Sequence, residues 1–462
     1  MSENNSIRNL GRILVEGELV LESPLIIGTG GGTESDNDIL RDGQGRPYIP
    51  GTSWAGAVRE YLTPLRDKRK YFERFFGTEK GKPSSTYQSA LITNDLFIKS
   101  VAEDNPTEFR ENVHIDPVTG TAQEGALFDY EVIRAGETFN FSFEVIVRGA
   151  MQEKPDLLNA FDIWAKLIIY YLQSGRIRLG AKTNSGYGKV SLRNPRYRLF
   201  DFGKKDDVHA WFSGRYELNP IVLTDQEYDI IENDDVLITG RFQLQDALMI
   251  RQNVQDREKV DSRHFLSGKH SLIPGTSLKG VLRQRATKIL KTLIPADTAE
   301  EKIKDLFGYV STEKESDAKA VKGRIQVGES IVQGGKRYVQ TRIKVDCFTG
   351  SVLEHALLQE EPLWDDGNTY FDLEILIRKP RKEDLGLILQ VLKDLWTGDL
   401  AIGGESSIGR GRFKGKAITI AENHQRYSIQ ADGDKVSFSN KENFTTIEEA
   451  WQKYIGQEVK NV

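Results

Sequence analysis

Cysteine is almost absent from this sequence of 462 residues, in which Cys347 is the single cysteine. Histidine is also scarce, with six residues. A single cysteine excludes an intramolecular disulfide and any zinc site built from several cysteines. His264 and His270 lie close together but lack a companion pair of cysteines, so they do not make a convincing zinc site either. A reducing compartment, the cytoplasm, is therefore expected.

Long apolar runs and an excess of one charge are also missing. The longest apolar stretch, residues 161–172, is interrupted by Asp162 and Lys166 and is shorter than the roughly 20 residues that cross a bilayer. The N-terminus has no basic segment followed by an apolar one, so neither a secretory signal nor a membrane partner is expected. Lys and Arg (63) nearly balance Asp and Glu (68), so any nucleic-acid site must be a local basic surface.

The sequence contains one pattern twice. Ile-Pro-Gly-Thr-Ser at residues 49–53 recurs 224 positions later, and three further pairs of segments follow in the same order. These pairs are residues 76–77 with 307–308, 113–122 with 343–352, and 179–189 with 402–412. The repetition predicts two homologous units, residues 1–195 and 233–416, joined by a linker at 196–232 and followed by a tail at 417–462.

Each unit has the pattern of a strand, a helix, further strands, a helix and a strand. At the start of each unit, apolar residues alternate with polar ones, which is typical of a strand. After this strand, the hydroxyl residues of the repeated turn stand where a helix N-cap is expected. The predicted fold class is α+β, with two tandem units that are ferredoxin-like or RNA-recognition-motif-like. The expected strands are 12–25, 138–148, 235–248 and 369–378, the expected helices are 157–173 and 384–396, and the expected N-caps are Thr52 or Ser53 and Thr276 or Ser277.

The tail after residue 417 has no counterpart behind the first unit. Its Asp432-Gly433 dipeptide predicts a hairpin turn. Thr445 and Glu448 have the spacing of a capping box, which predicts that a short helix starts there.

Glycine-rich segments close both units, within residues 179–189 and 402–412. Neither ends in the Gly-Lys-Ser/Thr of a nucleotide-binding P-loop. Their backbone N–H groups could hold a phosphodiester, assisted by Lys182 and Lys189 in one copy and Arg410 and Arg412 in the other. A tight structural turn is the competing interpretation.

A carboxylate recurs in the loop before each Pro-Gly-Thr-Ser turn. Asp36 precedes Pro50 by 14 residues, and Asp261 precedes Pro274 by 13. A carboxylate there could hold a divalent cation or act on a ribose hydroxyl near a phosphate. A loop aspartate is more commonly solvated surface, but its recurrence in both copies favours a function.

Taken together, these motifs resemble the RAMP superfamily and, more narrowly, the backbone subunits of type III CRISPR effector complexes. The acidic loop, the Pro-Gly-Thr-Ser turn, an Asp-x-x-Thr-Gly segment (116–120 and 346–350) and a final glycine loop occur twice in fixed order. The resemblance covers about residues 10–195 and 233–416. A chain with two such units is similar to the tandem backbone subunit of subtype III-D complexes.

The resemblance implies a place along a CRISPR guide RNA, beside other effector subunits and a target RNA. It also implies that the first-helix turn and the glycine loop contact RNA phosphates, and that thumb-like hairpins near the Asp-x-x-Thr-Gly segments enter the guide-target duplex. The implied RNA-binding residues are Thr52, Ser53, Arg59, Lys182, Tyr187, Lys189, Ser277, Lys279, Arg283, Arg410 and Arg412. Lys279 is replaced by Ala55 in the first unit, where Arg59 could substitute for it.

The resemblance further implies that Asp36 and Asp261 are catalytic and bind Mg²⁺ or another divalent cation during cleavage of the target RNA. Asp256 could take the place of Asp261 in the alignment. A metal-dependent endoribonuclease that acts by transesterification is therefore expected. Three alternatives stay open: a structural guide-binding subunit without its own cleavage activity, a nuclease that processes guide precursors, and a nucleotide-binding enzyme. No histidine recurs between the copies, which disfavours the second, and the failed P-loop patterns disfavour the third.

Overall fold

A computed structural model describes residues 7–30, 37–78, 87–99, 105–116, 121–231, 234–253, 260–309, 320–422, 425–433 and 435–460. The chain divides into two compact units, and each is described by itself. The first comprises residues 1–113, 124–183 and 187–232, and the second comprises residues 114–123, 184–186 and 233–462. Within the described ranges, no helix is long and apolar enough to cross a membrane.

The first unit is built on an antiparallel sheet in the order β3-β7-β1-β8-β9. Helix α1 follows β1, and helix α3 connects β7 to β8, so the chain runs strand, helix, strand, strand, helix, strand. With β1 between β7 and β8, this is the ferredoxin-like arrangement, and the α+β prediction is confirmed for this unit. The elements are β1 (Arg8–Leu21), α1 (Gly51–Leu62), β3 (Leu91–Thr93), β7 (Thr138–Gly149), α3 (Lys154–Gln173), β8 (Val190–Asp201) and β9 (Asn219–Pro220).

The first half of the chain also contains smaller elements. The predicted linker at 196–232 packs on the first unit: β8 extends into it, and Ile221, Leu223 and Tyr228 contact the first core. The remaining elements are β2 (Tyr48–Ile49), η1 (Thr63–Leu65), α2 (Phe72–Phe76), β4 (Leu96–Phe97), β5 (Thr107–Ile115), β6 (Ala122–Ile133), η2 (Met151–Glu153), η3 (Thr183–Ser185), α4 (Lys205–Ser213) and α5 (Asp225–Tyr228).

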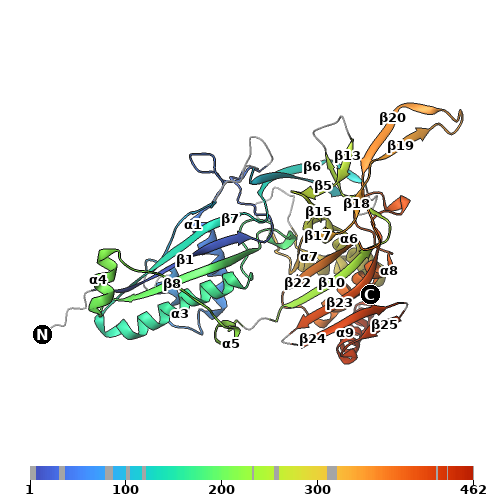
Figure 1. Cartoon of the computed structure of the whole chain (residues 1–462). Coiled ribbons are helices and arrows are strands. Elements are labelled where there is room, and N and C mark those ends of the chain that lie inside the picture. Colours follow the sequence, from blue (N-terminus) through green and yellow to red (C-terminus); the bar gives the residue numbers. More distant parts are fainter. Residues whose placement is uncertain are drawn as a thin grey trace. The chain divides into compact units, whose positions relative to one another are not determined.

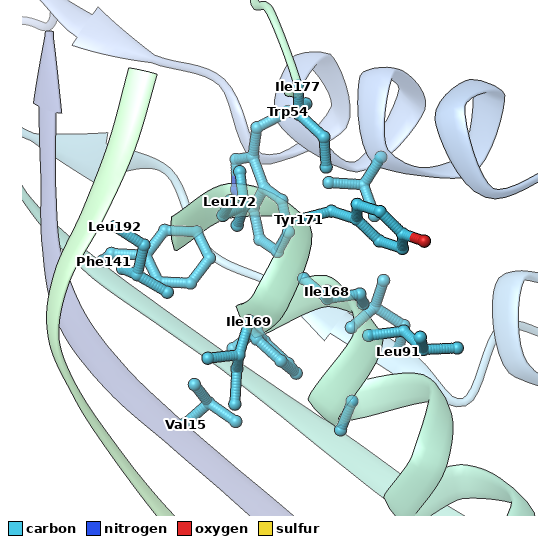
Figure 2. Packing of buried hydrophobic residues seen from close by; sticks show 14 of the residues in the cluster. Val15, Trp54, Leu91, Phe141, Ile168, Ile169, Tyr171, Leu172, Ile177 and Leu192 are labelled. Carbon is cyan, nitrogen blue, oxygen red and sulfur yellow. The ribbon is translucent and has the colours of Figure 1, made fainter. Parts of the chain in front are cut away.

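The core of the first unit forms where α1 and α3 meet the sheet. Ile169 and Leu172, one turn apart on α3, are buried, as expected for the apolar stripe of an amphipathic helix. Trp54 of α1 packs on Phe141 of β7 with ring centroids 5.1 Å apart. Figure 2 shows these side chains together with Val15 of β1. Each such buried side chain contributes roughly 1.5–3 kcal/mol, so this core holds the sheet and helices that carry the loops.

The second unit repeats the arrangement with the strand order β17-β22-β10-β23. Helix α6 follows β10, and α8 connects β22 to β23, so this unit is ferredoxin-like as well. Its main elements are β10 (Val236–Leu244), α6 (Gly275–Leu293), α7 (Ala296–Phe307), β16 (Ile325–Val327), β17 (Ser330–Gln333), β22 (Tyr370–Ile377), α8 (Lys382–Thr397), η4 (Ser406–Ile408) and β23 (Phe413–Glu422). Short strands β11 (Ala247–Leu248), β12 (Arg251–Asn253), β13 (Ser262–His264), β14 (Leu266–Ser267), β15 (His270–Ile273), β18 (Lys336–Arg337), β19 (Gln340–Val345), β20 (Val352–Glu361) and β21 (Leu363–Trp364) carry its loops.

The tail extends the second sheet and covers α8. The predicted hairpin is present, because β24 (Gln425–Asp432) pairs with β25 (Lys435–Phe438) and β24 pairs with β23. Helix α9 (Lys441–Lys460) packs on α8, where a Cβ added to Gly386 would lie 2.6 Å from Trp451 Cβ. The capping-box prediction is wrong: α9 begins four residues before Thr445, whose hydroxyl donates to Lys441 O at 3.2 Å inside the helix.

Both first helices begin at the glycine of the Pro-Gly-Thr-Ser turn. The N-cap residues are Pro50 and Pro274, whose φ and ψ of −57°, 138° and −59°, 142° suit that position. In α1 the Gly51 N–H donates to Asp95 Oδ1 at 2.7 Å, so a carboxylate from a distant loop takes the capping role. The N-cap prediction is therefore wrong for Thr52, Ser53, Thr276 and Ser277, which lie within the first helical turn.

Candidate nucleic-acid interface

The two glycine loops have the same backbone geometry. Leu179 N donates to Gly188 O at 2.9 Å, and Ile402 N donates to Gly411 O at 2.9 Å. Gly188 and Gly411 share a φ of +76°, and a Cβ added to them would lie 1.8 Å and 2.0 Å from the carbonyl oxygens of Leu179 and Ile402. Only glycine satisfies both conditions, so the tight structural turn accounts for these glycines.

Gly411→Ala is expected to destabilise the second unit by about 3 kcal/mol or more. The left-handed φ and the 2.0 Å approach of Ile402 O both penalise the added methyl group. Gly409→Ala is the matched control, because Gly409 has a φ of +92° with no atom within 4 Å of the added Cβ. It should cost only the backbone strain, about 1–2 kcal/mol. Urea unfolding measures both variants, and equal losses would contradict this account.

In the first unit, the glycine loop places Lys182 over an aromatic surface. The Lys182 ammonium lies 3.7 Å from the ring centroid of Tyr130 and 5.0 Å from that of Phe128. Desolvation lowers the pKa of Lys182 to about 8, although the residue as a whole remains exposed. Tyr187 lies beneath, only 3% exposed, with its ring 6.2 Å from Tyr130. The ring of Tyr187 is part of a small core, and its predicted contact with RNA stays a prediction.

In the second unit, Glu405 occupies the position of Lys182, with a φ of +61° against +53°. Arg410 takes the place of Tyr187 and is 3% exposed. It donates to the carboxylates of Glu405 and Glu360, the latter fully buried. One buried and one half-buried carboxylate thus already neutralise the charge of Arg410, and its predicted contact with RNA phosphate stays a prediction.

Two more arginines complete this ionic cluster. Arg342 donates to Glu405 Oε1 at 3.0 Å, and Arg251 donates to Glu360 Oε1 at 2.9 Å and to Glu405 Oε1 at 3.2 Å. Sequence reasoning missed the cluster. The sequence did contain a signal for it. The offsets of the repeat align Glu360 with Tyr130 and Glu405 with Lys182, so both positions are acidic in the second unit and neither is acidic in the first.

The first-helix turns also differ between the units. On α6, Lys279 and Arg283 lie one turn apart, and within the described part of the chain neither side chain has a carboxylate or carbonyl partner. Burial and the neighbouring Arg283 lower the pKa of Lys279 to about 8, and burial also lowers the pKa of Arg283. Two partly desolvated cations without a counter-ion favour an anionic ligand at this helix.

On α1 the corresponding positions are already engaged. Ala55 stands at the lysine position, and Arg59 lies 3.5 Å from Glu73 Oε2 and donates to Phe76 O at 3.4 Å. Asp95 occupies the helix start. The guanidinium of Arg59 is therefore already paired with protein groups.

The remaining predicted contacts lie near these turns and loops. Thr52 is exposed, and Ser53 and Ser277 are half-buried in the first helical turns. Arg412 is exposed just before β23, while Lys189 is half-buried and bridges Arg178 through its backbone.

The acidic loop of the first unit lies between two paired segments. Gly28 forms an antiparallel bridge with Ile39, and Leu40 N donates to Ile27 O at 2.8 Å. Asp36, three residues before Ile39, lies outside the described residues, as does the loop before it.

The acidic loop of the second unit is flanked in the same register. Arg251 of β12 pairs with His264 of β13, and Phe265 N donates to Ile250 O at 2.8 Å. Three residues before His264 stands Asp261. Because both aspartates precede the bridging residue by the same number of positions, the register makes Asp261, and not Asp256, the equivalent of Asp36; Asp256 also lies outside the described residues.

Asp261 is exposed and held by the backbone of β20. Its Oδ2 accepts the Gln359 N–H at 2.7 Å, and its own N–H donates to Gln359 O at 2.8 Å. Among the described residues, no group of three or more His, Cys, Asp or Glu side chains gathers as a metal site. One oriented carboxylate suits Mg²⁺ only if water and RNA phosphates supply the other ligands, which is common for this ion.

Both units of the chain match a known protein family. The model of the RAMP superfamily matches residues 18–191 and 237–414. The chain belongs to the RAMP superfamily. The two matches confirm the tandem form, one RAMP unit in each half. The chain is also similar to the "CRISPR system Cms endoribonuclease Csm3" of Methanocaldococcus jannaschii, with 28% identity over 213 residues, covering 40% of this chain and 79% of that protein.

In the second RAMP unit, the Asp-x-x-Thr-Gly segment closes the hairpin of β19 and β20. Asp346 Oδ1 accepts the N–H groups of Phe348 and Thr349 at 2.9 Å and 2.7 Å, and Gly350 completes the turn with a φ of +69°. Figure 1 shows this hairpin extending from its unit. The motif is thus a turn whose backbone N–H groups are hydrogen-bonded by its own aspartate. The turn presents Phe348, which is 94% exposed, at the tip of the hairpin.

Proposed function

We propose that this chain is a backbone subunit of a type III CRISPR complex that binds guide RNA and cleaves complementary target RNA at two sites. The similarity to Csm3 and the equivalent register of Asp36 and Asp261 support this proposal. The other subunits of such a complex and the two RNAs are then its partners. The decisive experiment is the pattern of target-RNA fragments that the assembled complex produces when each aspartate is changed in turn.

The proposed reaction is a transesterification within the target RNA. The 2′-hydroxyl oxygen attacks the adjacent phosphorus as the bond from phosphorus to the 5′-oxygen breaks. The hydroxyl proton leaves to a base and the 5′-oxygen gains a proton, so a cyclic 2′,3′-phosphate and a 5′-hydroxyl result. A kinked RNA backbone would bring the three reacting atoms into line.

The loop carboxylate would assist removal of the 2′-hydroxyl proton. Asp261 is suited to this because the backbone of Gln359 orients one of its oxygens while the residue stays exposed to a ligand. Mg²⁺ or another divalent cation, bound between this carboxylate and RNA phosphates, would neutralise charge on the phosphate.

We propose that the two units hold the guide RNA with different elements. The first unit offers Lys182 of its glycine loop, while its helix α1 lacks a free cation among the positions described above. The second unit offers Lys279 and Arg283 on α6, while its glycine loop carries the neutralised cluster around Glu405. Each unit thus keeps a partly desolvated lysine, at a different place in the same fold.

Guide-RNA affinity is expected to fall by up to about tenfold for each of two lysines between pH 7 and pH 9 at constant salt. Lys182 and Lys279 have pKa values of about 8, so the cations that would contact phosphate are present below this pH and are lost above it. A bound phosphate raises these pKa values, so the midpoint in the complex lies above 8.

Filter binding across this pH range measures the effect. The control is the chain with both Lys182→Arg and Lys279→Arg, because arginine stays protonated and its affinity should be nearly flat with pH. The same decline in this variant would assign the pH dependence to other groups.

A further inference from the structure

An arginine follows Asp261 by two residues. Asp261 stands at the bend that precedes β13, and Arg263 lies within β13 between Ser262 and His264, which are 8% and 0% exposed. Two residues of chain span at most about 7 Å, which a guanidinium on its flexible stem can bridge. Arg263 can therefore reach a group that Asp261 also contacts.

Arg263 is not neutralised by the acidic residues around it. Glu360, the register partner of Ser262 on β20, is occupied by the arginine cluster. Glu361, the register partner of Arg263 on β20, is paired with Arg337 at 3.7 Å.

The guanidinium itself has an unmet hydrogen-bond donor. Arg263 Nε is buried, and it has no hydrogen-bond partner among the residues that the structure describes. No ion pair of Arg263 occurs in that part of the chain either. A guanidinium whose charge has no carboxylate partner in the described part of the chain favours an anionic ligand, and Asp261, two residues before it, stands close by.

The first unit has the opposite charge at this position. The shared register aligns Arg263 with Asp38, whose backbone oxygen accepts the Thr29 N–H at 3.0 Å. The two positions therefore differ in charge, because an aspartate stands in the first unit where an arginine stands in the second.

We propose that Arg263 binds a non-bridging oxygen of the scissile phosphate at the second site, where the first unit has Asp38 at the equivalent position. The inference rests on the proposed function of Asp261. Negative charge grows on these oxygens when the 2′-hydroxyl attacks, and a guanidinium donates two hydrogen bonds to a phosphate in a fixed geometry. Arg263 thus adds stabilisation of the transition state to the action of the carboxylate.

The test uses the assembled complex with its guide and a labelled target RNA. Arg263→Ala is expected to slow the cut that Asp261→Ala removes by roughly tenfold to a hundredfold, while the cut assigned to Asp36 and the target affinity stay unchanged. Arg263→Lys should restore part of the rate, because it keeps the charge but not the two-pronged donor. Arg426→Ala, which removes an exposed arginine from β24, is the matched control and should leave both cuts unchanged.

The outcomes separate this inference from the proposed function. If Asp261→Ala removes a cut that Arg263→Ala leaves at full rate, Arg263 has no part in the reaction and the inference is overturned. If Arg263→Ala slows both cuts equally or weakens target binding alone, the arginine does not act at the second phosphate, and the inference also fails. If Asp261→Ala removes no cut, the proposed catalytic role of Asp261 fails first.

Discussion

Asp36→Ala and Asp261→Ala are each expected to remove one of two adjacent cuts in the target RNA, by roughly 10²- to 10⁴-fold in rate. That is the usual contribution of a positioned acid-base group. Target binding and assembly should be unaffected, because Asp261 is exposed and the core lies elsewhere. Fragment lengths on a denaturing gel, with single-turnover rates, measure both variants, and the double variant should show neither cut.

Asp256→Ala is the control for the alignment of the acidic loop. The register of β12 and β13 makes Asp261 the equivalent of Asp36, so changing Asp256 should leave both cuts in place. If the fragment pattern changes in Asp256→Ala but not in Asp261→Ala, Asp256 and not Asp261 is the equivalent of Asp36. An unchanged ladder in all these variants would leave a guide-binding subunit without its own cleavage activity.

Removing both cations of α6, with Lys279→Ala and Arg283→Ala together, is expected to weaken guide-RNA binding on the order of tenfold to a hundredfold for each phosphate that is no longer bound. The slope of log affinity against log salt should become shallower by roughly 0.7 per phosphate. The physical reason is that both cations lack a counter-ion within the described part of the chain and are partly desolvated. Affinity measured from low to high salt, with guides of two unrelated sequences, tests this.

Arg59→Ala is the matched control on α1, because Arg59 stands at the position that corresponds to Arg283 in the repeat. Glu73 and the Phe76 carbonyl already engage its guanidinium, so its loss should change the salt slope little. An equal loss from Arg59→Ala would show that the two helices grip RNA alike. An effect confined to one guide sequence would argue against phosphate binding altogether.

Much of the fold was predictable because it depends on local patterns that survive in a single sequence. Apolar alternation located β7 and β22 to within about a residue, and the repeated turn marked where α1 and α6 begin. The helix caps were predicted wrongly because hydroxyl residues after a Pro-Gly pair suggest capping, whereas the proline itself supplied the extended backbone of the N-cap position. Which group then satisfies the helix N–H depends on a residue far away in sequence, such as Asp95.

The sequence alone determined the duplication, the α+β class, the family resemblance and the pair of candidate aspartates, because repeats, periodicity and motif spacing are properties of the chain itself. Tertiary structure decided which charges are free. Arg410 and Lys279 were equivalent candidates as residue types. Arg410 is neutralised by Glu360 and Glu405, whereas Lys279 has the cation Arg283 beside it and no carboxylate partner among the described residues. Burial and pairing are set by segments that are distant in the sequence, as Arg410 and Glu360 are, so the availability of a charge to RNA appears only once the chain has folded.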